Sequence, residues 1–180
     1  MAIDPELVRR IDRLGVTGFD GEAFRHVSPD LEPLSTTGAR IHGGRWNPPE
    51  RFGALYLALD VETVAAELRR TAASQNLELV DLLPRTLYRF HVRAGRLLDL
   101  TSPEAAAALD LSPRELHGRV RTRCQAVGAA AHYLSVEGIL APSAAGPGSV
   151  LALYPDRLGP EAIVEPVEAI TGWVPPPPAS

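Results

Sequence analysis

The order of helix-like and strand-like segments is the feature that most constrains the fold of this chain. In a parallel α/β sheet, strands and helices alternate in a regular βαβ series, but here the two kinds of segment follow one another irregularly. The mixed order therefore predicts an α+β domain. Strands are expected at 23–27, 54–59, 86–93, 97–100, 138–142, 149–154 and 162–170, and helices at 5–14, 60–74 and 123–136, with two short ones opening at Ser102-Pro103 and Ser112-Pro113.

Two stretches of this pattern bear most directly on a site. Residues 54–59 form an apolar run of strand length, and Asp60 follows at the position of a helix N-cap, opening a helix that we expect to reach Ser74. Residues 29–47 instead form a long irregular stretch rich in glycine and proline. Because compact domains seldom keep long loops without a use for them, this stretch is expected to contribute to function.

Size and composition limit the domain organisation of the chain and the kinds of site that it can form. The 180 residues, 45% of them hydrophobic, fit one globular domain, which we place at 1–172, followed by a proline-rich tail at 173–180. All 18 basic residues are arginines, which excludes a Schiff-base lysine. Cys124 is the single cysteine and the five histidines are scattered, so neither an internal disulfide nor a metal site is expected.

Charge and hydropathy indicate where such a protein works. A net charge of −4 argues against direct nucleic-acid binding through a broad basic surface. The N-terminal residues carry charges throughout, unlike a signal peptide, and no run approaches the ~20 apolar residues of a membrane span. We therefore expect a cytoplasmic protein with no membrane partner. The sequence leaves open whether the chain forms a homo-oligomer or a hetero-oligomer.

The first two motifs with candidate site residues lie in the first half of the chain. In Gly43-Gly44-Arg45-Trp46-Asn47, the glycines permit a sharp turn or close approach to a ligand, and the guanidinium of Arg45 can bind a phosphate or carboxylate. Tyr56 faces the opposite side of its strand from the neighbouring leucines, and Glu67 lies at the margin of the next helix's apolar stripe. The simpler alternatives are a structural turn with a surface arginine, and a Glu67 paired with Arg70 on the helix surface.

The other two motifs are weaker when taken alone. Thr122 and Gln125 lie near the start of the long helix, where free N–H groups and the helix dipole attract anions. The alternative there is an N-cap threonine between solvated arginines. Ser143 follows a strand in Pro142-Ser143-Ala144, a setting that is equally typical of a turn.

Taken in order along the chain, these motifs resemble the RES-domain family. The resemblance runs from Phe24-Arg25 through the glycine–arginine motif, Tyr56 and Glu67 to Gln125-Ala126-Val127-Gly128 and the serine motif, about residues 24–155. It implies an ADP-ribosyltransferase-like fold, a split β-core with surrounding helices. It also implies the NAD⁺-depleting toxin of a bacterial toxin–antitoxin pair, whose partner is an Xre-type helix-turn-helix antitoxin that inserts into the active site.

The resemblance also assigns site residues. Catalytic roles fall on Arg45, Tyr56 and Glu67, and substrate contacts on Arg25, Trp46, Asn47 and Gln125. The family's serine has two candidate counterparts here, Thr122 and Ser143. No metal or cofactor is implied, because NAD⁺ is itself the substrate, joined by inorganic phosphate where phosphate is the acceptor.

These assignments suggest a mechanism for breaking the nicotinamide–ribose bond. The transition state resembles an oxocarbenium ion, which Glu67 would stabilise while holding the ribose hydroxyls. Arg25 and Arg45 would hold the diphosphate or an incoming phosphate, and Tyr56 would pack against the nicotinamide or its ribose. The acceptor stays open between water, as in an NAD⁺ glycohydrolase, and phosphate, as in an NAD⁺ phosphorylase. A protein ADP-ribosyltransferase and a non-catalytic interaction module are the remaining alternatives.

Overall fold

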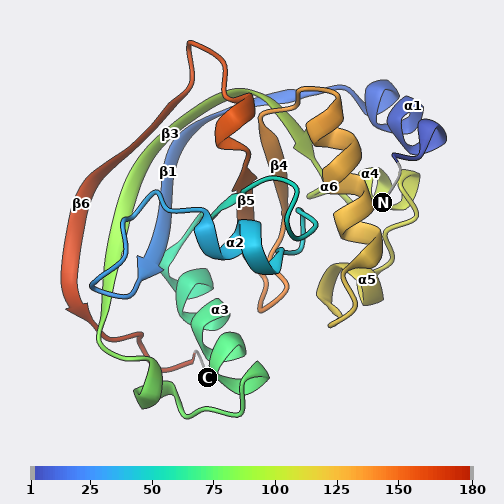
Figure 1. Ribbon diagram of the computed structural model, residues 1–180. Helices are drawn as coiled ribbons and strands as arrows, with labels where there is room; N and C mark the ends of the chain where they lie inside the picture. Colours follow the sequence, from blue (N-terminus) through green and yellow to red (C-terminus); the bar gives the residue numbers. More distant parts are fainter. Residues whose placement is uncertain (1–2, 179–180) are drawn as a thin grey trace.

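The computed structural model describes residues 3–178 and confirms the α+β class (Figure 1). Its strands are β1 (Thr17–Val27), β2 (Leu55–Ala58), β3 (Arg85–Asp99), β4 (Gly138–Pro142), β5 (Ser149–Leu153) and β6 (Ile163–Trp173). Its α-helices are α1 (Pro5–Leu14), α2 (Thr37–His42), α3 (Val61–Ser74), α4 (Pro103–Ala108), α5 (Pro113–His117) and α6 (Thr122–Tyr133). Two short 3-10 turns, η1 (Leu79–Leu82) and η2 (Pro155–Arg157), complete the described chain.

The sheet divides around the long strand β3. The part of β3 up to Arg93 lies between β1 and β6, whereas residues 97–99 pair in parallel with β4. β1 also pairs with β2 at Phe24 and Ala58, β2 pairs with β5, and β5 with β4. Strands β1, β2, β5, β4 and β3 therefore close a barrel-like ring, and β6 extends the sheet along the outer edge of β3 (Figure 1).

Helices cover parts of this sheet and pack against it through hydrophobic side chains. α1, α4, α5 and α6 share the largest core with the end of β3 and with β4, where Leu98 and Ile139 are fully buried. A second cluster packs the strands of the ring against one another. α3 covers a third region, in which Leu68 packs with Leu87 and Trp173. This arrangement leaves α3 and the start of α6 on two sides of the β2 strand end, where the cavity described below opens.

The local sequence signals around α3, α4 and α5 are confirmed. The Asp60 carboxylate accepts the N–H of Thr63 at 2.6 Å and caps α3, whose apolar stripe is buried. α4 and α5 each begin with a proline preceded by a capping serine, Ser102 and Ser112. Strong caps fix helix starts locally, which is why the sequence located them correctly.

Two predictions were wrong: one concerned the loop at 29–47, and the other concerned the lengths of two strands. The stretch 29–47 contains a helix, α2, which buries none of its side chains and therefore has no apolar stripe in the sequence. The segments 86–93 and 97–100 belong to one strand, because β1 pairs along β3 from Thr86 to Leu97 across the Ala94-Gly95-Arg96 interruption. For the same reason β1 is longer than the strand expected at 23–27, since its first half pairs with that far end of β3.

Two element ends were also misplaced. The long helix ends at Tyr133, where Ser135 has φ 57, a left-handed conformation that ends the helix, and Gly138 begins β4. Trp173, which we placed in the tail, closes β6 and is buried against α3. The rest of β6 is an outer strand whose side chains are mostly exposed, so the sequence did not indicate that its last residue is buried.

Candidate active site

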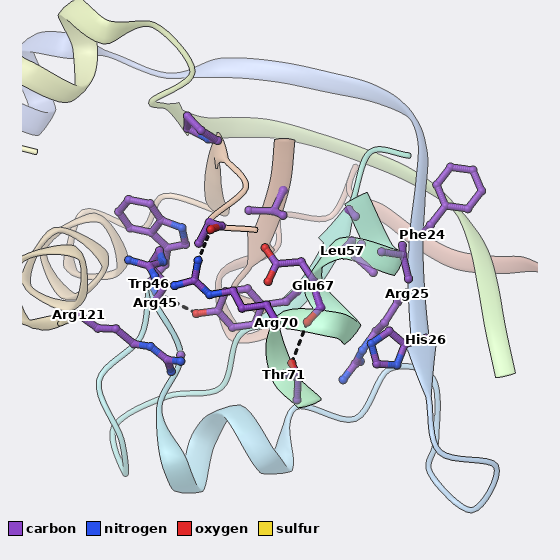
Figure 2. Close-up of a pocket in the computed structure, with 17 residues that line it drawn as sticks. Phe24, Arg25, His26, Arg45, Trp46, Leu57, Glu67, Arg70, Thr71 and Arg121 are labelled. Carbon is purple, nitrogen blue, oxygen red and sulfur yellow. Dashed lines mark hydrogen bonds between the residues drawn. The ribbon is translucent and has the colours of Figure 1, made fainter. Parts of the chain in front are cut away.

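A cavity of about 360 Å³ opens between β1, β2, α3, the start of α6 and the turn that follows β4. Five of the residues predicted from the motifs line it: Arg25, Arg45, Trp46, Tyr56 and Glu67 (Figure 2). The fold thus brings the two motifs of the first half of the chain to one place.

Glu67 lies between Arg25 on one side and three other arginines of the cavity lining on the opposite side, Arg45, Arg70 and Arg121 (Figure 2). Its Oε1 accepts a hydrogen bond of 2.6 Å from the hydroxyl of Ser143, which in turn accepts the N–H of Ala145 at 3.0 Å. Ser143 is fully buried, so this contact fixes the direction of the carboxylate. Within the described chain no ion pair joins Glu67 to Arg70, and the surface-pair alternative is therefore wrong.

The hydroxyl of Tyr56 is an internal anchor. It accepts the backbone N–H of Trp46 and donates to the side-chain oxygen of Asn47, both at 2.9 Å. A Cβ at Gly44 would lie 2.2 Å from this hydroxyl, so the turn requires glycine there. Burial raises the pKa of Tyr56 well above its ordinary value. Tyr56 therefore keeps its proton near neutral pH, and its ring rather than its hydroxyl is available to a ligand.

Asn47 and Gln125 support the cavity without lining it. Asn47 is fully buried, and its Nδ2 donates to the carbonyls of Ala39 at 2.7 Å and Phe52 at 3.0 Å. Gln125 reaches from α6 to the carbonyl of Gly44 at 3.0 Å. Both side chains hold the glycine–arginine turn in place, so the structure gives them a supporting position rather than the predicted contact with substrate.

Trp46 joins this turn to the core. Its side chain is fully buried yet borders the cavity, and its carbonyl accepts the hydroxyl of Tyr154 at 3.0 Å. A Cβ on Gly128 of α6 would lie 1.9 Å from the same carbonyl oxygen. The glycine of the Gln125-Ala126-Val127-Gly128 stretch therefore allows α6 to approach the turn closely.

The two candidates for the family's serine occupy different surroundings. Thr122 is exposed at the first position of α6 and is not among the residues that line the cavity. Ser143 is buried and holds Glu67. The hydroxyl that the fold brings to the carboxylate is thus that of Ser143.

Arg25 and Arg45 both use two nitrogens to hold neighbouring backbone. Arg45 donates to the carbonyls of Glu115 and Gly118, each at 2.7 Å. Arg25 donates to two carbonyls of the loop after β1, at 2.7 and 2.8 Å, and burial lowers its pKa. Neither guanidinium has a carboxylate partner among the described residues, so each offers the cavity its positive charge and its remaining N–H groups.

The motifs missed two further arginines of the cavity, Arg70 and Arg121. Arg70 lies one turn after Glu67 on α3, and this spacing, which places both on one helix face, was the available signal. Arg121 directly precedes α6, and only the fold brings it to the cavity. Among the described residues that line the cavity, Glu67 is the single acidic one, so the site is strongly cationic.

His26, which follows Arg25 on β1, is a neutral member of the lining. Its ring stacks on Trp173 with 6.3 Å between ring centroids, and its Nδ1 is buried without a hydrogen-bond partner in the described chain. Burial, and then the nearby charges of Arg85 and Arg25, lower its pKa from 6.5 to about 4.

This depressed pKa predicts a pH-dependent stability. Between pH 6.5 and about 4 the unfolded chain binds a proton on His26 that the folded chain does not, so the free energy of unfolding should fall as the pH falls through that window. The contribution is at most about 3 kcal/mol, and it is fully present above pH 6.5. Urea unfolding of the wild type and of His26→Phe at pH 7 and pH 4.5 should show a smaller loss in the variant. Equal losses in the two proteins would contradict the prediction.

Residues 3–178 contain no candidate metal cluster and no candidate membrane span. In that part of the chain, no group of three His, Cys, Asp or Glu side chains lies close enough together to hold a metal ion. None of its helices combines the length and the apolar character that crossing a membrane requires.

Comparison with known proteins places this geometry in a family. Residues 22–175 match the family model described as the RES domain. The NAD(+) phosphorylases MbcT of Mycobacterium tuberculosis and Mycobacterium bovis are each 38% identical to the chain over 162 residues, which cover 88% of this chain and 87% of theirs. The crystal structure of the M. tuberculosis MbcT–MbcA toxin–antitoxin complex is similar with a TM-score of 0.81 and 34% identity, over 94% of this chain and 93% of that chain. Because the family model spans most of the chain, this protein belongs to the RES-domain family.

Proposed function

We propose that this protein is an NAD⁺ phosphorylase that acts as the toxin of a toxin–antitoxin pair. In this reaction the nicotinamide–ribose bond of NAD⁺ breaks, nicotinamide leaves as a neutral molecule, and inorganic phosphate takes its place to give ADP-ribose 1″-phosphate. The proposal is supported by the 38% identity with NAD(+) phosphorylase MbcT, which extends over the residues that build the cavity.

The observation that carries this proposal is the single carboxylate of a cationic cavity, Glu67, held in one orientation by Ser143. Loss of nicotinamide builds positive charge on the ribose, and a fixed anion beside it lowers the barrier. A carboxylate that already has its orientation requires no reorganisation when the charge develops.

The other side chains take roles that follow from their position. Arg25 and Arg45 attract the diphosphate of NAD⁺ or the incoming phosphate, mainly through charge, because part of each fork already holds backbone. The ring of Tyr56 packs against the nicotinamide or its ribose. Ser143 acts through Glu67 as a positioning residue.

We also infer that the sheet divided around β3 corresponds to the split β-core of ADP-ribosyltransferases. The partner in this proposal is a helix-turn-helix antitoxin of Xre type that inserts into the cavity. The similarity to MbcT in the MbcT–MbcA toxin–antitoxin complex supports an antitoxin partner for this chain.

Product analysis tests the reaction directly. Purified protein is incubated with NAD⁺ in buffers with and without inorganic phosphate, and the products are identified by mass spectrometry. We expect nicotinamide release to accompany turnover, and ADP-ribose 1″-phosphate to be the main product when phosphate is present. ADP-ribose as the main product under both conditions would identify a glycohydrolase, and label from radioactive NAD⁺ on protein would identify a protein ADP-ribosyltransferase. Absence of nicotinamide release would favour a non-catalytic module.

A further inference from the structure

Three arginines meet on one side of Glu67: Arg45, Arg70 and Arg121, which we call the arginine cluster (Figure 2). Arg70 donates to the carbonyls of Ala144, of His117 at 2.9 Å and of Gly118 at 3.3 Å. Since Arg45 donates to the same Gly118 oxygen, two guanidinium groups share one neutral acceptor. Such an approach of like charges favours the arrival of an anion.

The arginine cluster brings three positive charges together, and Glu67 is the single carboxylate among the described residues that line the cavity with it. None of its three members forms an ion pair with any residue between 3 and 178, and the acid nearest in the cavity, Glu67, is engaged by Ser143. Burial, and then the nearby charge of Arg45, lower the pKa of Arg70, although the charge of Glu67 acts in the opposite direction. The cluster therefore holds excess positive charge in a partly enclosed space.

Arg121 is the member whose donors are free. It is exposed, it lines the cavity, and it makes no hydrogen bond within the described chain, whereas Arg45 and Arg70 are tied to backbone. Arg70 and Arg121 come from α3 and from the start of α6, so an anion between them would be held from two elements. The planar forks of two arginines suit the oxygens of a phosphate.

A second cationic region lies on the other side of Glu67. There Arg25 lies beside the ring of His26, whereas the ring of Phe24 points away from Glu67 (Figure 2). One carboxylate between two cationic regions suits a reaction with two anionic reactants, a dinucleotide and a separate phosphate. The side of the arginine cluster fits the small anion, because the donors of Arg121 are free there.

We propose that Arg70 and Arg121 form the binding subsite for the inorganic phosphate co-substrate, a role that rests on the proposed phosphorylase function. An oxygen of HPO₄²⁻ held there forms a bond to C1″ of the ribose, and the C1″–N bond breaks with its electron pair going to nicotinamide. The phosphate proton stays on the new ester, so atoms and charge balance without a further reactant.

The test compares Arg121→Gln with Arg119→Gln. Both substitutions remove one positive charge from the same exposed segment, but Arg119 does not line the cavity. Initial rates are measured while NAD⁺ and phosphate are varied separately. We expect Arg121→Gln to raise the KM for phosphate at least about tenfold, as loss of a charge-assisted hydrogen bond does, and to change the KM for NAD⁺ less than about twofold. Arg70→Lys, which keeps the charge but loses the fork, should shift the same constant in the same direction.

The possible results distinguish a failure of the proposed phosphate subsite from a failure of the proposed phosphorylase reaction. An Arg121→Gln protein whose KM for phosphate matches that of Arg119→Gln, or whose KM for NAD⁺ rises instead, would overturn the subsite. Calorimetric titration of inorganic phosphate into the protein without NAD⁺ gives the second readout. Phosphate binding that is weakened by Arg121→Gln, in a wild type that never forms ADP-ribose 1″-phosphate, would support the subsite and reject the proposed reaction. No phosphate binding and no phosphate-dependent turnover in the wild type would reject both.

Discussion

Replacing Glu67 by glutamine is expected to slow NAD⁺ cleavage by about 10²–10³-fold while the protein stays folded. The amide keeps the size of the side chain and can still accept a hydrogen bond from Ser143, but it lacks the negative charge that stabilises the developing ribosyl cation. The rate of nicotinamide release at saturating NAD⁺ measures the effect, and circular dichroism checks the fold.

Glu62→Gln provides the matched control for this experiment. Glu62 lies in the first turn of the same helix, is exposed and does not line the cavity, so its loss removes an equal charge from α3 without touching the site. Its variant should turn over NAD⁺ at close to the wild-type rate. If Glu67→Gln also does so, the carboxylate has no part in the chemistry and the proposed mechanism fails.

The second large effect concerns stability. Glu137 is a buried carboxylate that accepts three backbone N–H groups: those of Gly95 at 2.6 Å, Arg96 at 2.9 Å and Gly159 at 2.7 Å. Gly95 and Arg96 lie where β3 passes from β6 to β4, so this side chain holds the point at which the sheet divides. Glu137→Ala would remove three charge-assisted hydrogen bonds at once, and we expect the free energy of unfolding to fall by about 3–5 kcal/mol.

Urea unfolding followed by circular dichroism measures this loss. Glu161→Ala is the control, because Glu161 is exposed, and its substitution should change the free energy of unfolding by no more than about 0.5 kcal/mol. A change of similar small size in Glu137→Ala would show that the strands divide at this point without help from the carboxylate.

The parts of the fold that the sequence predicted correctly are those with local causes. The start of α3 follows from the Asp60 cap, and the short helices α4 and α5 follow from serine–proline pairs. The continuous β3 and the helix α2 were not predictable in this way. β3 runs on because β1 pairs along both of its parts, and α2 has no buried face, so neither leaves a periodic pattern in the chain.

The features of the candidate site also fall into those that the sequence predicted and those that only the fold revealed. The motifs pointed to Arg45, Tyr56 and Glu67, and the fold gathers all three around one cavity. The sequence did not reveal that the hydroxyl of Tyr56 is hydrogen-bonded to the glycine–arginine turn, or that Arg70 and Arg121 complete the cationic lining. A residue type indicates which chemistry is available, but its hydrogen-bond partners decide whether that chemistry faces a ligand.

The sequence by itself determined the family, the α+β class and the residue types of the site, since these depend on motifs and patterns that are local in the chain. The tertiary structure alone decided which hydroxyl meets the carboxylate and how the arginines are arranged. Ser143 lies 76 positions after Glu67, and Arg45 lies 70 and 73 positions before its carbonyl partners Glu115 and Gly118. Contacts across such separations form only when the closed sheet and its covering helices bring distant segments together, and no local preference of the chain encodes them.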